Sequence, residues 1–328
     1  MSPQSRFLLQ LCILVLILGL CAVFSVSASD YEVDSDTYLE DPASIPTLSH
    51  KWTSGNIPLS NLTIEQKEKI RSLKSKPVNT TIAKETLPIT VPTDLPEFFD
   101  WRDNNGDWTT PVKDQGEECG SCWAHAVIGI LESHVKILED NPNLNIDLSE
   151  QYLLSCDHDD DGCDGGDFET AMPYLVDTPG PDGLVGTVLE QNYPYDEISD
   201  ACKNLSGLER FTAGKWAYVN ATTESDDAEV SLPTVEELKA AIYLKGPIGV
   251  GVDDDDAFDE YSGGIFYSEE ESDETNHAVI LVGWGADEEG EFFIGKNSIG
   301  TEWGEGGWFN IDVHSSRIGE GAVYFDTV

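Results

Sequence analysis

The composition of this 328-residue chain is typical of a globular protein with a full core, since 40% of its residues are apolar. Its 62 acidic and 18 basic residues give a net charge of −44. This charge argues against nucleic acid and anionic membrane surfaces as partners, because both repel an acidic protein.

The N-terminus has the pattern of a secretory signal peptide. An apolar run at residues 7–24 follows Arg6 and precedes the Val-Ser-Ala triplet at 26–28. The pattern predicts cleavage after Ala28, so that residues 1–28 are a signal peptide. An uncleaved membrane anchor is the alternative, because the run is long for a signal peptide and short for a span. We expect a secreted protein, or one delivered to a lysosome or vacuole.

Residues 29–93 are predicted to be a pro-segment and linker. They are rich in Ser, Thr, Pro and Lys and lack the dense apolar runs found later in the chain. Residues 65–84 carry a net charge of +4, whereas residues 94–328, with 53 acidic and 10 basic residues, carry −43. These opposite charges predict that the pro-segment is held against the domain that follows it.

One helix is predicted inside the pro-segment. Thr63 and Gln66 have the spacing of a capping box at a helix start. We expect this helix to run through Lys76, with Ile70 and Leu73 on one face.

Residues 94–328 divide into a helical half, about 94–205, and a β half, about 206–328. A helix is predicted from Ser121 or Cys122 to the Asn-Pro pair at 141–142, and shorter helices follow Ser149 and Gly166. The predicted strands are 246–252, 278–284, 291–296, 307–313 and 322–325. Helices followed by strands indicate an α+β fold. The acidic run at residues 253–256 is interpreted as a solvated turn rather than a metal site.

Without the signal peptide the chain has an odd number of cysteines, which fits two disulfides and one free thiol in an oxidising compartment. The five are Cys119, Cys122, Cys156, Cys163 and Cys202. A redox pair at Cys119 and Cys122 would need a βαβ context, and a zinc site would need a second close Cys/His pair. The remaining interpretation gives Cys119 a disulfide and leaves Cys122 a thiol whose thiolate is favoured by the helix dipole.

A thiolate nucleophile needs an imidazole partner and a group that orients it. His277 opens an apolar strand, and Asn297 follows the next strand a hairpin away. At this point the sequence resembles the papain/cathepsin family of cysteine proteases over nearly all of residues 96–328. The motifs occur in family order: FDWR at 99–102, PVKDQG at 111–116, CGSCWA at 119–124, SEQ at 149–151, GCDGG at 162–166, YPY at 193–195, GGI at 263–265, HAV at 277–279, KNS at 296–298 and WGEGG at 303–307.

The resemblance implies a papain-like two-lobed fold and a cysteine endopeptidase made as an inactive precursor. It implies that Cys122 attacks the peptide carbonyl, that His277 forms an ion pair with the thiolate and protonates the leaving amine, and that Asn297 orients the imidazole. Gln115 would contribute to the oxyanion hole. The implied disulfides are Cys119 with Cys163 and Cys156 with Cys202.

The resemblance also implies the substrate-binding residues: Gly165 and Gly166 as an edge for the substrate backbone, with Asp167, Ala278 and Trp303 nearby. Peptides and the chain's own pro-segment are the expected partners. We expect a monomer that does not bind nucleic acid and that uses no cofactor or metal. Asp167 stands where this family often has a larger apolar residue, and we interpret it as favouring Lys or Arg near the scissile bond.

Two departures from the family pattern stand out. Gln115 lies seven residues before Cys122 instead of six, so Glu117 or Glu118 is expected to bulge outward. Ile299 replaces the common Trp that shields the pair of His277 and Asn297. Two alternatives stay open: an enzymatically silent protein of the same shape, and a thiol oxidoreductase with a disulfide between Cys119 and Cys122.

Overall fold

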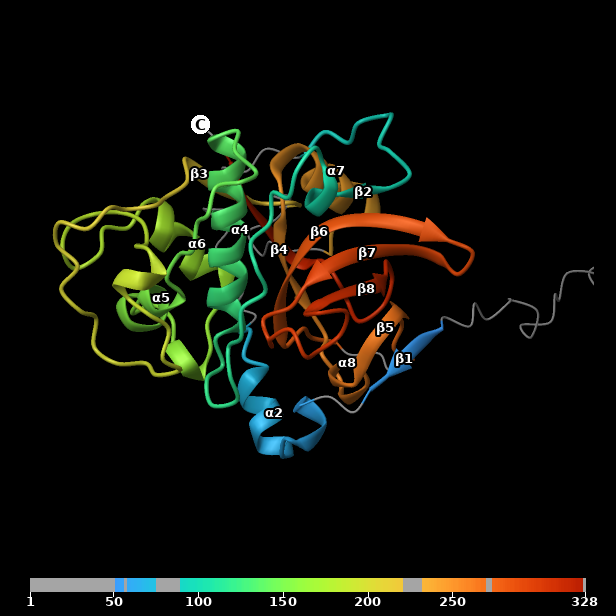
Figure 1. The fold of residues 1–328 in the computed structure, drawn as a ribbon, viewed down its shortest axis with the longest axis horizontal. Helices are drawn as coiled ribbons and strands as arrows, with labels where there is room; N and C mark the ends of the chain where they lie inside the picture. The colour runs from blue at the N-terminus through green and yellow to red at the C-terminus, as the bar shows by residue number, and fades with distance from the viewer. Residues whose placement is uncertain (1–50, 56–57, 75–88, 221–231, 270–272, 327–328) are drawn as a thin grey trace, which may run out of the picture. The chain divides into compact units, whose positions relative to one another are not determined.

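In the residues that the structure describes, a nine-stranded mixed sheet covered by helices is the framework (Figure 1). The computed structural model describes residues 51–55, 58–74, 89–220, 232–269 and 273–326. The predicted signal peptide and most of the predicted linker lie outside these residues. Within the described part of the chain, none of the helices is long and apolar enough to cross a bilayer.

The helices of the described residues precede most of the strands in the chain, as the α+β prediction requires. The helices are α2 (Ile64–Ile70), α4 (Cys122–Leu138), α5 (Glu150–Cys156), α6 (Phe168–Val176), α7 (Val235–Lys245) and α8 (Asp256–Asp259). The strands are β1 (Trp52–Ser54), β2 (Phe99–Asp100), β3 (Lys215–Tyr218), β4 (Ile248–Val252), β5 (Tyr261–Phe266), β6 (His277–Asp287), β7 (Gly290–Lys296), β8 (Trp308–Asp312) and β9 (Glu320–Asp326). The order β1-β5-β8-β7-β6-β4-β9-β3 forms the sheet, and β2 pairs with β6.

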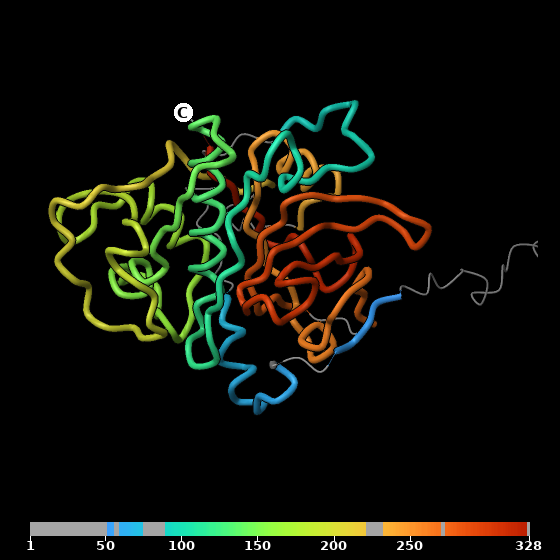
Figure 2. The backbone as a smooth tube through the Cα atoms, in the orientation of Figure 1, coloured from blue at the N-terminus to red at the C-terminus, as the bar shows by residue number. Residues whose placement is uncertain are grey.

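The central helix α4 separates the two lobes. In Figure 1 it lies between α5 and α6 on one side and the strands β6, β7 and β8 on the other. Its buried side chains contribute to a core that also includes α5, α6 and one face of the sheet. The opposite face of the sheet forms a second core with α7 and α8. The trace in Figure 2 shows the chain returning to the strands only after the helical lobe is complete.

Strand β6 serves both cores because its side chains alternate between the two faces of the sheet. Ala278 and Ile280 belong to the core with α4, whereas Val279 and Leu281 belong to the core with α7. This alternation fixes the first residue of the strand, His277, at the junction of the two lobes. The sheet thereby holds the predicted imidazole opposite the start of α4.

The N-terminal helix α2 is shorter than the sequence predicts. The capping box is confirmed, because Gln66 N donates to Thr63 Oγ1 over 3.2 Å and Thr63 N donates to Gln66 Oε1 over 3.1 Å. The prediction of a helix through Lys76 is wrong, since α2 ends at Ile70. Residues after Ile70 instead pair in extended conformation with Gly166 of the helical lobe, and this tertiary contact overrides the helical pattern.

Candidate active site

Helix α4 places Cys122 at its first position, where the side chain is fully buried. Ser121, the residue before the helix, makes no capping hydrogen bond with its side chain. The exposed N–H groups and the dipole at this helix end therefore favour a negative charge on the sulfur. In the part of the chain that the structure describes, Cys122 is the one cysteine outside a disulfide.

The antiparallel pair of β6 and β7 brings His277 and Asn297 together. His277 begins β6, and Asn297 follows the last residue of β7. The distance between His277 Nε2 and Asn297 Oδ1 is 2.8 Å, and both side chains are buried. His277 Nδ1 makes no hydrogen bond of ordinary geometry. The amide of Asn297 therefore orients the ring by one nitrogen and leaves the other nitrogen for the thiol.

The pKa values of Cys122 and His277 are shifted in opposite directions. Burial by itself raises the pKa of the thiol, but the positive charge of His277 and the backbone N–H groups of Ser72 and Ala278 lower the pKa below its ordinary value. Burial by itself lowers the pKa of His277, whereas the charge of Cys122, then that of Asp254, raises it to about 9. Each group thus stabilises the charged form of the other, which favours the pair of thiolate and imidazolium.

Gln115 is fully buried beside this pair. Its Oε1 accepts a hydrogen bond from Ser298 Oγ over 2.7 Å, which turns Nε2 toward the cleft. Nε2 donates to the carbonyl oxygen of Ile70 over 3.0 Å. The extra residue before Cys122 is accommodated as predicted, with Glu117 and Glu118 both exposed.

Residues 70–74, the end of α2 and the four residues after it, lie across the candidate site. Leu73 pairs with Gly166 in a parallel bridge, flanked by Gly166 N to Ser72 O at 3.3 Å and Lys74 N to Gly166 O at 2.9 Å. Leu73 N also donates to Asn276 O over 2.9 Å. A Cβ atom on Gly165 would lie 2.5 Å from Ser72 O, so only glycine allows the chain to lie this close.

The two disulfides brace the helical lobe around the nucleophile. Cys119 pairs with Cys163, and Cys156 pairs with Cys202, as the family resemblance implies. A redox pair of Cys119 and Cys122 is thereby excluded, because the first sulfur is bonded elsewhere.

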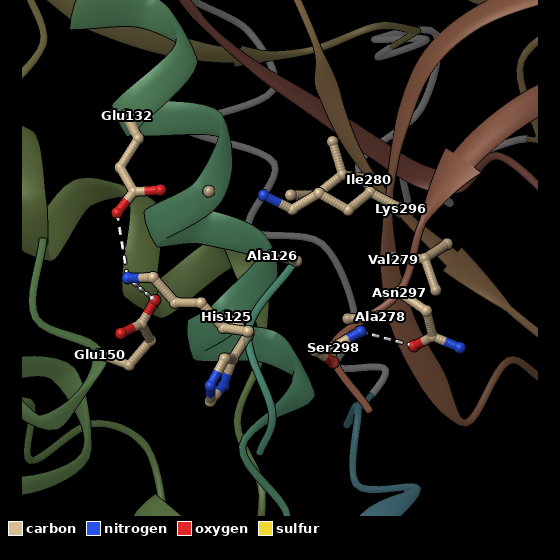
Figure 3. Close-up of a pocket in the computed structure, with 12 residues that line it drawn as sticks. His125, Ala126, Glu132, Glu150, Ala278, Val279, Ile280, Lys296, Asn297 and Ser298 are labelled. Carbon is tan, nitrogen blue, oxygen red and sulfur yellow. Dashed lines mark hydrogen bonds and ion pairs between the residues drawn. The ribbon is translucent and has the colours of Figure 1, made fainter. Parts of the chain in front are cut away.

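A buried cluster of charges connects the lobes behind the site. We call Lys113, Glu132, Glu150 and Lys296 the interlobe cluster. Lys113 Nζ lies 3.0 Å from Glu132 Oε1 and 2.8 Å from Glu150 Oε1, and Lys296 Nζ donates to the carbonyl oxygen of Thr110 over 2.9 Å. Figure 3 shows the two glutamates on the helical side and Lys296, with the β6 side chains, on the other side of a cavity of about 10 Å³. Asn297 lines this cavity next to Lys296, so the interlobe cluster supports the strand end that carries it.

Comparisons with known proteins agree with this geometry. The family model described as papain family cysteine protease matches residues 95–324. The chain is 36% identical to a viral cathepsin of Cydia pomonella granulosis virus over 225 residues, which are 69% of this chain and 60% of that protein. It is 35% identical to cathepsin L of Sarcophaga peregrina over 224 residues, 66% of this chain and 59% of that protein. The structure of digestive procathepsin L2 proteinase from Tenebrio molitor larval midgut superposes with a TM-score of 0.72 at 28% identity, covering 84% of each chain.

The chain therefore belongs to the papain family of cysteine proteases. Its fold is the two-lobed α+β fold of the procathepsin structures. The chain spans 56% to 60% of the length of two viral cathepsins and of cathepsin L from Sarcophaga peregrina.

The predicted substrate-binding residues do not all line the open cleft. Gly165 and Gly166 form its edge, and Ala278 lies beside Cys122. Asp167 is 4% exposed, and its carboxylate caps α6 by accepting from Glu169 N. Trp303 is fully buried, and its Nε1 donates to the carbonyl oxygen of Asp259 over 3.0 Å. Direct substrate contact by Asp167 and Trp303 stays a prediction.

One part of the site escaped the sequence analysis. The solvated turn predicted at residues 253–256 is wrong for Asp253 and Asp254, which are 9% and 4% exposed. Asp254 also lies near enough to His277 to raise its pKa. The sequence shows only four consecutive aspartates here. Burial of the second one depends on basic residues about 180 positions earlier in the chain.

Proposed function

We propose that this chain is the precursor of a cysteine endopeptidase that cleaves peptide bonds with Cys122 as nucleophile and His277 as acid and base. The observation that carries the proposal is the position of His277, fixed by Asn297 on one nitrogen and electrostatically paired with the Cys122 thiolate on the other. Asn297 is a positioning residue, and Gln115 donates to the developing oxyanion.

The reaction that this arrangement supports has two halves. The thiolate of Cys122 attacks the peptide carbonyl carbon, and the carbonyl electron pair moves to the oxygen, which Gln115 Nε2 stabilises. Collapse of this intermediate breaks the C–N bond, and the amine leaves with the proton of the His277 imidazolium. Water then attacks the thioester while His277 accepts its proton, which releases the carboxylic acid and restores the thiolate.

The same contacts make residues 58–74 part of an inhibitory pro-segment. The carbonyl of Ile70 accepts the hydrogen bond of Gln115 that the mechanism reserves for the oxyanion, and Leu73 occupies the Gly166 edge reserved for substrate. We infer that peptide substrates bind where this segment lies, and that hydrolysis begins when it is removed. Processing after a signal peptide, in a secretory or lysosomal compartment, completes the proposal.

The nucleophile is tested by Cys122→Ala in the activated enzyme. Hydrolysis of peptide substrates is expected to fall below detection, while the folded protein is still secreted, because a small side chain at a helix start contributes little to the core. An epoxide reagent at low molar excess should label the wild type and not the variant. Activity within tenfold of the wild type would overturn the assignment, and labelling without hydrolysis would instead favour a silent protein of the same shape.

The roles of His277 and Asn297 are separated by comparing their alanine variants. His277→Ala should lower kcat more than Asn297→Ala, because histidine carries the proton and asparagine only orients the ring. His158→Ala is the matched control, since this histidine is exposed and outside the cleft. The assignment of roles is wrong if Asn297→Ala is the more damaging change.

A further inference from the structure

Three carboxylates of the β lobe line the cleft next to His277, and we call Asp254, Asp256 and Asp259 the acidic wall. Asp254 lies between β4 and α8, and the other two residues begin and end α8. Asp254 and Asp259 are 4% and 0% exposed, whereas the side chain of Asp256 is 79% exposed. Asp254 N donates to Asn276 Oδ1 over 2.8 Å, which fixes the wall to the residue before His277.

Two cations of the N-terminal segment are seated on the acidic wall. Arg71 Nη2 lies 2.6 Å from Asp259 Oδ2, and Arg71 Nε lies 3.4 Å from Asp254 Oδ2. Lys67 Nζ lies 2.9 Å from Asp259 Oδ2 and 3.1 Å from Asp256 Oδ1. The side chains of both basic residues are 13% exposed. The wall is therefore a built receptor for a guanidinium or ammonium group, and a ligand of that chemistry occupies it.

The buried carboxylates retain further capacity to accept hydrogen bonds. Oδ1 of Asp254 and Oδ1 of Asp259 are both buried without a hydrogen-bond partner. Burial raises the pKa of Asp254 to about 7 and also raises that of Asp259. The departure of Arg71 and Lys67 therefore leaves these two groups to be neutralised by another cation or by a proton, or to be solvated by water.

The direction of residues 71–74 places the acidic wall on one side of the scissile bond. Residues 72–74 lie along Gly166, and the backbone of Ser72 lies at the Cys122 sulfur. Arg71 therefore lies on the other side of the nucleophile from the Gly166 edge. That side adjoins His277, which gives its proton to the leaving amine. Because the acyl part of a substrate stays on Cys122 while the leaving amine lies beside His277, a cleaved peptide must run in the opposite direction to residues 71–74. A substrate residue bound by the wall then follows the scissile bond.

We propose that the acidic wall is a specificity subsite that binds an Arg or Lys side chain on the C-terminal side of the scissile bond. This inference rests on the proposed function and adds the class of substrate. Arginine is expected to bind better than lysine, because its planar guanidinium bridges two carboxylates as Arg71 does. The proposal differs from a general attraction of cations to an acidic protein, because it depends on particular carboxylates.

The experiment uses enzyme activated from the full-length precursor and a series of internally quenched peptides. The peptides are identical except for Arg, Lys, Gln or Glu at the first or second position after the scissile bond. The ratio of kcat/KM for the Arg peptide to that for the Gln peptide should be tenfold or more at one of these positions. A ratio within twofold at both positions overturns the proposal.

Variants of the wall assign the preference to its residues. Asp259→Asn should reduce the Arg/Gln ratio to threefold or less, and Asp256→Asn, at an exposed position that tolerates change, should reduce it about twofold. Glu260→Gln removes one exposed charge next to the wall and is the matched control, for which the ratio should stay as in the wild type. An equal loss in Glu260→Gln would mean that only the overall field acts, and this outcome would overturn the proposal.

A second substrate separates this proposal from the proposed function. A peptide ending in aminomethylcoumarin has no residue after the scissile bond, so its turnover reports catalysis alone. Absence of turnover in the wild type would contradict the proposed function. Turnover with no preference in the quenched peptides would contradict the subsite and leave the catalytic assignment standing. If Asp259→Asn does not fold, the wild-type ratios and Asp256→Asn decide the matter.

Discussion

The interlobe cluster and the acidic wall use the same chemistry in different ways. Both contain buried carboxylates that are paired with lysine or arginine. Both also lie near β6 and β7, the strands that position His277 and Asn297. The interlobe cluster takes its cations, Lys113 and Lys296, from the peptidase domain itself. The acidic wall takes Arg71 and Lys67 from the N-terminal segment. The first cluster is permanent, and the second lasts only as long as that segment stays in place.

This difference shows how a buried charge becomes either a structural or a functional element. A buried ion pair whose partners never separate contributes to a unique arrangement of the lobes. When one partner is on a removable segment, the remaining charges become a binding site. The predictions below test the contrast, from the largest expected effect to the smallest.

Breaking the interlobe cluster should have the largest effect. Glu132→Gln is expected to lower the free energy of unfolding of the inactive Cys122→Ala precursor by about 3 kcal/mol, because it removes the fully buried carboxylate that pairs with half-buried Lys113 and leaves Lys113 only its other acidic partners. Chemical denaturation measures this loss. Asp147→Asn is the control, since Asp147 also contacts Lys113 but is 59% exposed, and its loss should cost less than about 1 kcal/mol. Equal losses would contradict the structural role of the cluster.

Breaking the ion pairs of the acidic wall should open the precursor without unfolding it. Arg71→Gln is expected to raise the rate at which iodoacetamide alkylates Cys122 in the precursor by about 10- to 100-fold, in line with about 2 kcal/mol for a buried charge pair. Lys74→Gln is the control, because its partner Asp161 is 70% exposed, and it should change the rate less than about threefold. Equal alkylation rates in the two variants would contradict the role of the acidic wall in keeping the precursor closed.

The acidic wall should also tune the pKa of the catalytic histidine. The charge of Asp254 raises the pKa of His277, so Asp254→Asn should lower that pKa. Activity needs the imidazolium and is lost as pH rises through its pKa, so the alkaline limb of kcat/KM, expected near pH 9, should move to lower pH in the variant. Lys296→Met, in the interlobe cluster, is the comparison, and its alkaline limb should move less than that of Asp254→Asn. An unmoved limb in Asp254→Asn would exclude this coupling.

The smallest expected effect is that of salt, which should act differently on the two clusters. Screening lengths fall from about 30 Å at 0.01 M to about 3 Å at 1 M, and partly exposed pairs are screened more than buried ones. Alkylation of Cys122 in the precursor should therefore accelerate a few-fold with salt. Over the same range the unfolding free energy of the acidic domain should rise as self-repulsion is screened. A rate independent of salt would contradict the electrostatic account of the segment's binding.

Local signals predicted much of the fold and the catalytic group. The capping box at Thr63, the start of α4 at Cys122 and the five predicted strands all correspond to elements of the structure, within a few residues at each end. These features depend on short-range periodicity and on helix-end chemistry, which a single sequence displays. The ordered motifs then indicated that His277 and Asn297 lie together, and the structure places them 2.8 Å apart.

Tertiary contacts account for what the sequence analysis missed. Helix α7 and the strands β3 and β5 were not predicted, since their apolar pattern is weaker than that of the central elements. Helix α2 ends early because Leu73 pairs with Gly166 across the cleft. Asp254 is buried and paired with Arg71, far away in the chain, and a run of aspartates alone gives no sign of such a partner.

Residues 67–74 bind to the site as part of the same chain, and this determines when the precursor opens. A segment joined to its binding site by a short linker experiences an effective concentration on the order of millimolar. Contacts of only modest affinity therefore keep the precursor closed. A single cut after Lys74 releases the segment to the bulk concentration, which is far lower. The cut makes opening irreversible without any rearrangement of Cys122 and His277, which already lie together in the closed precursor.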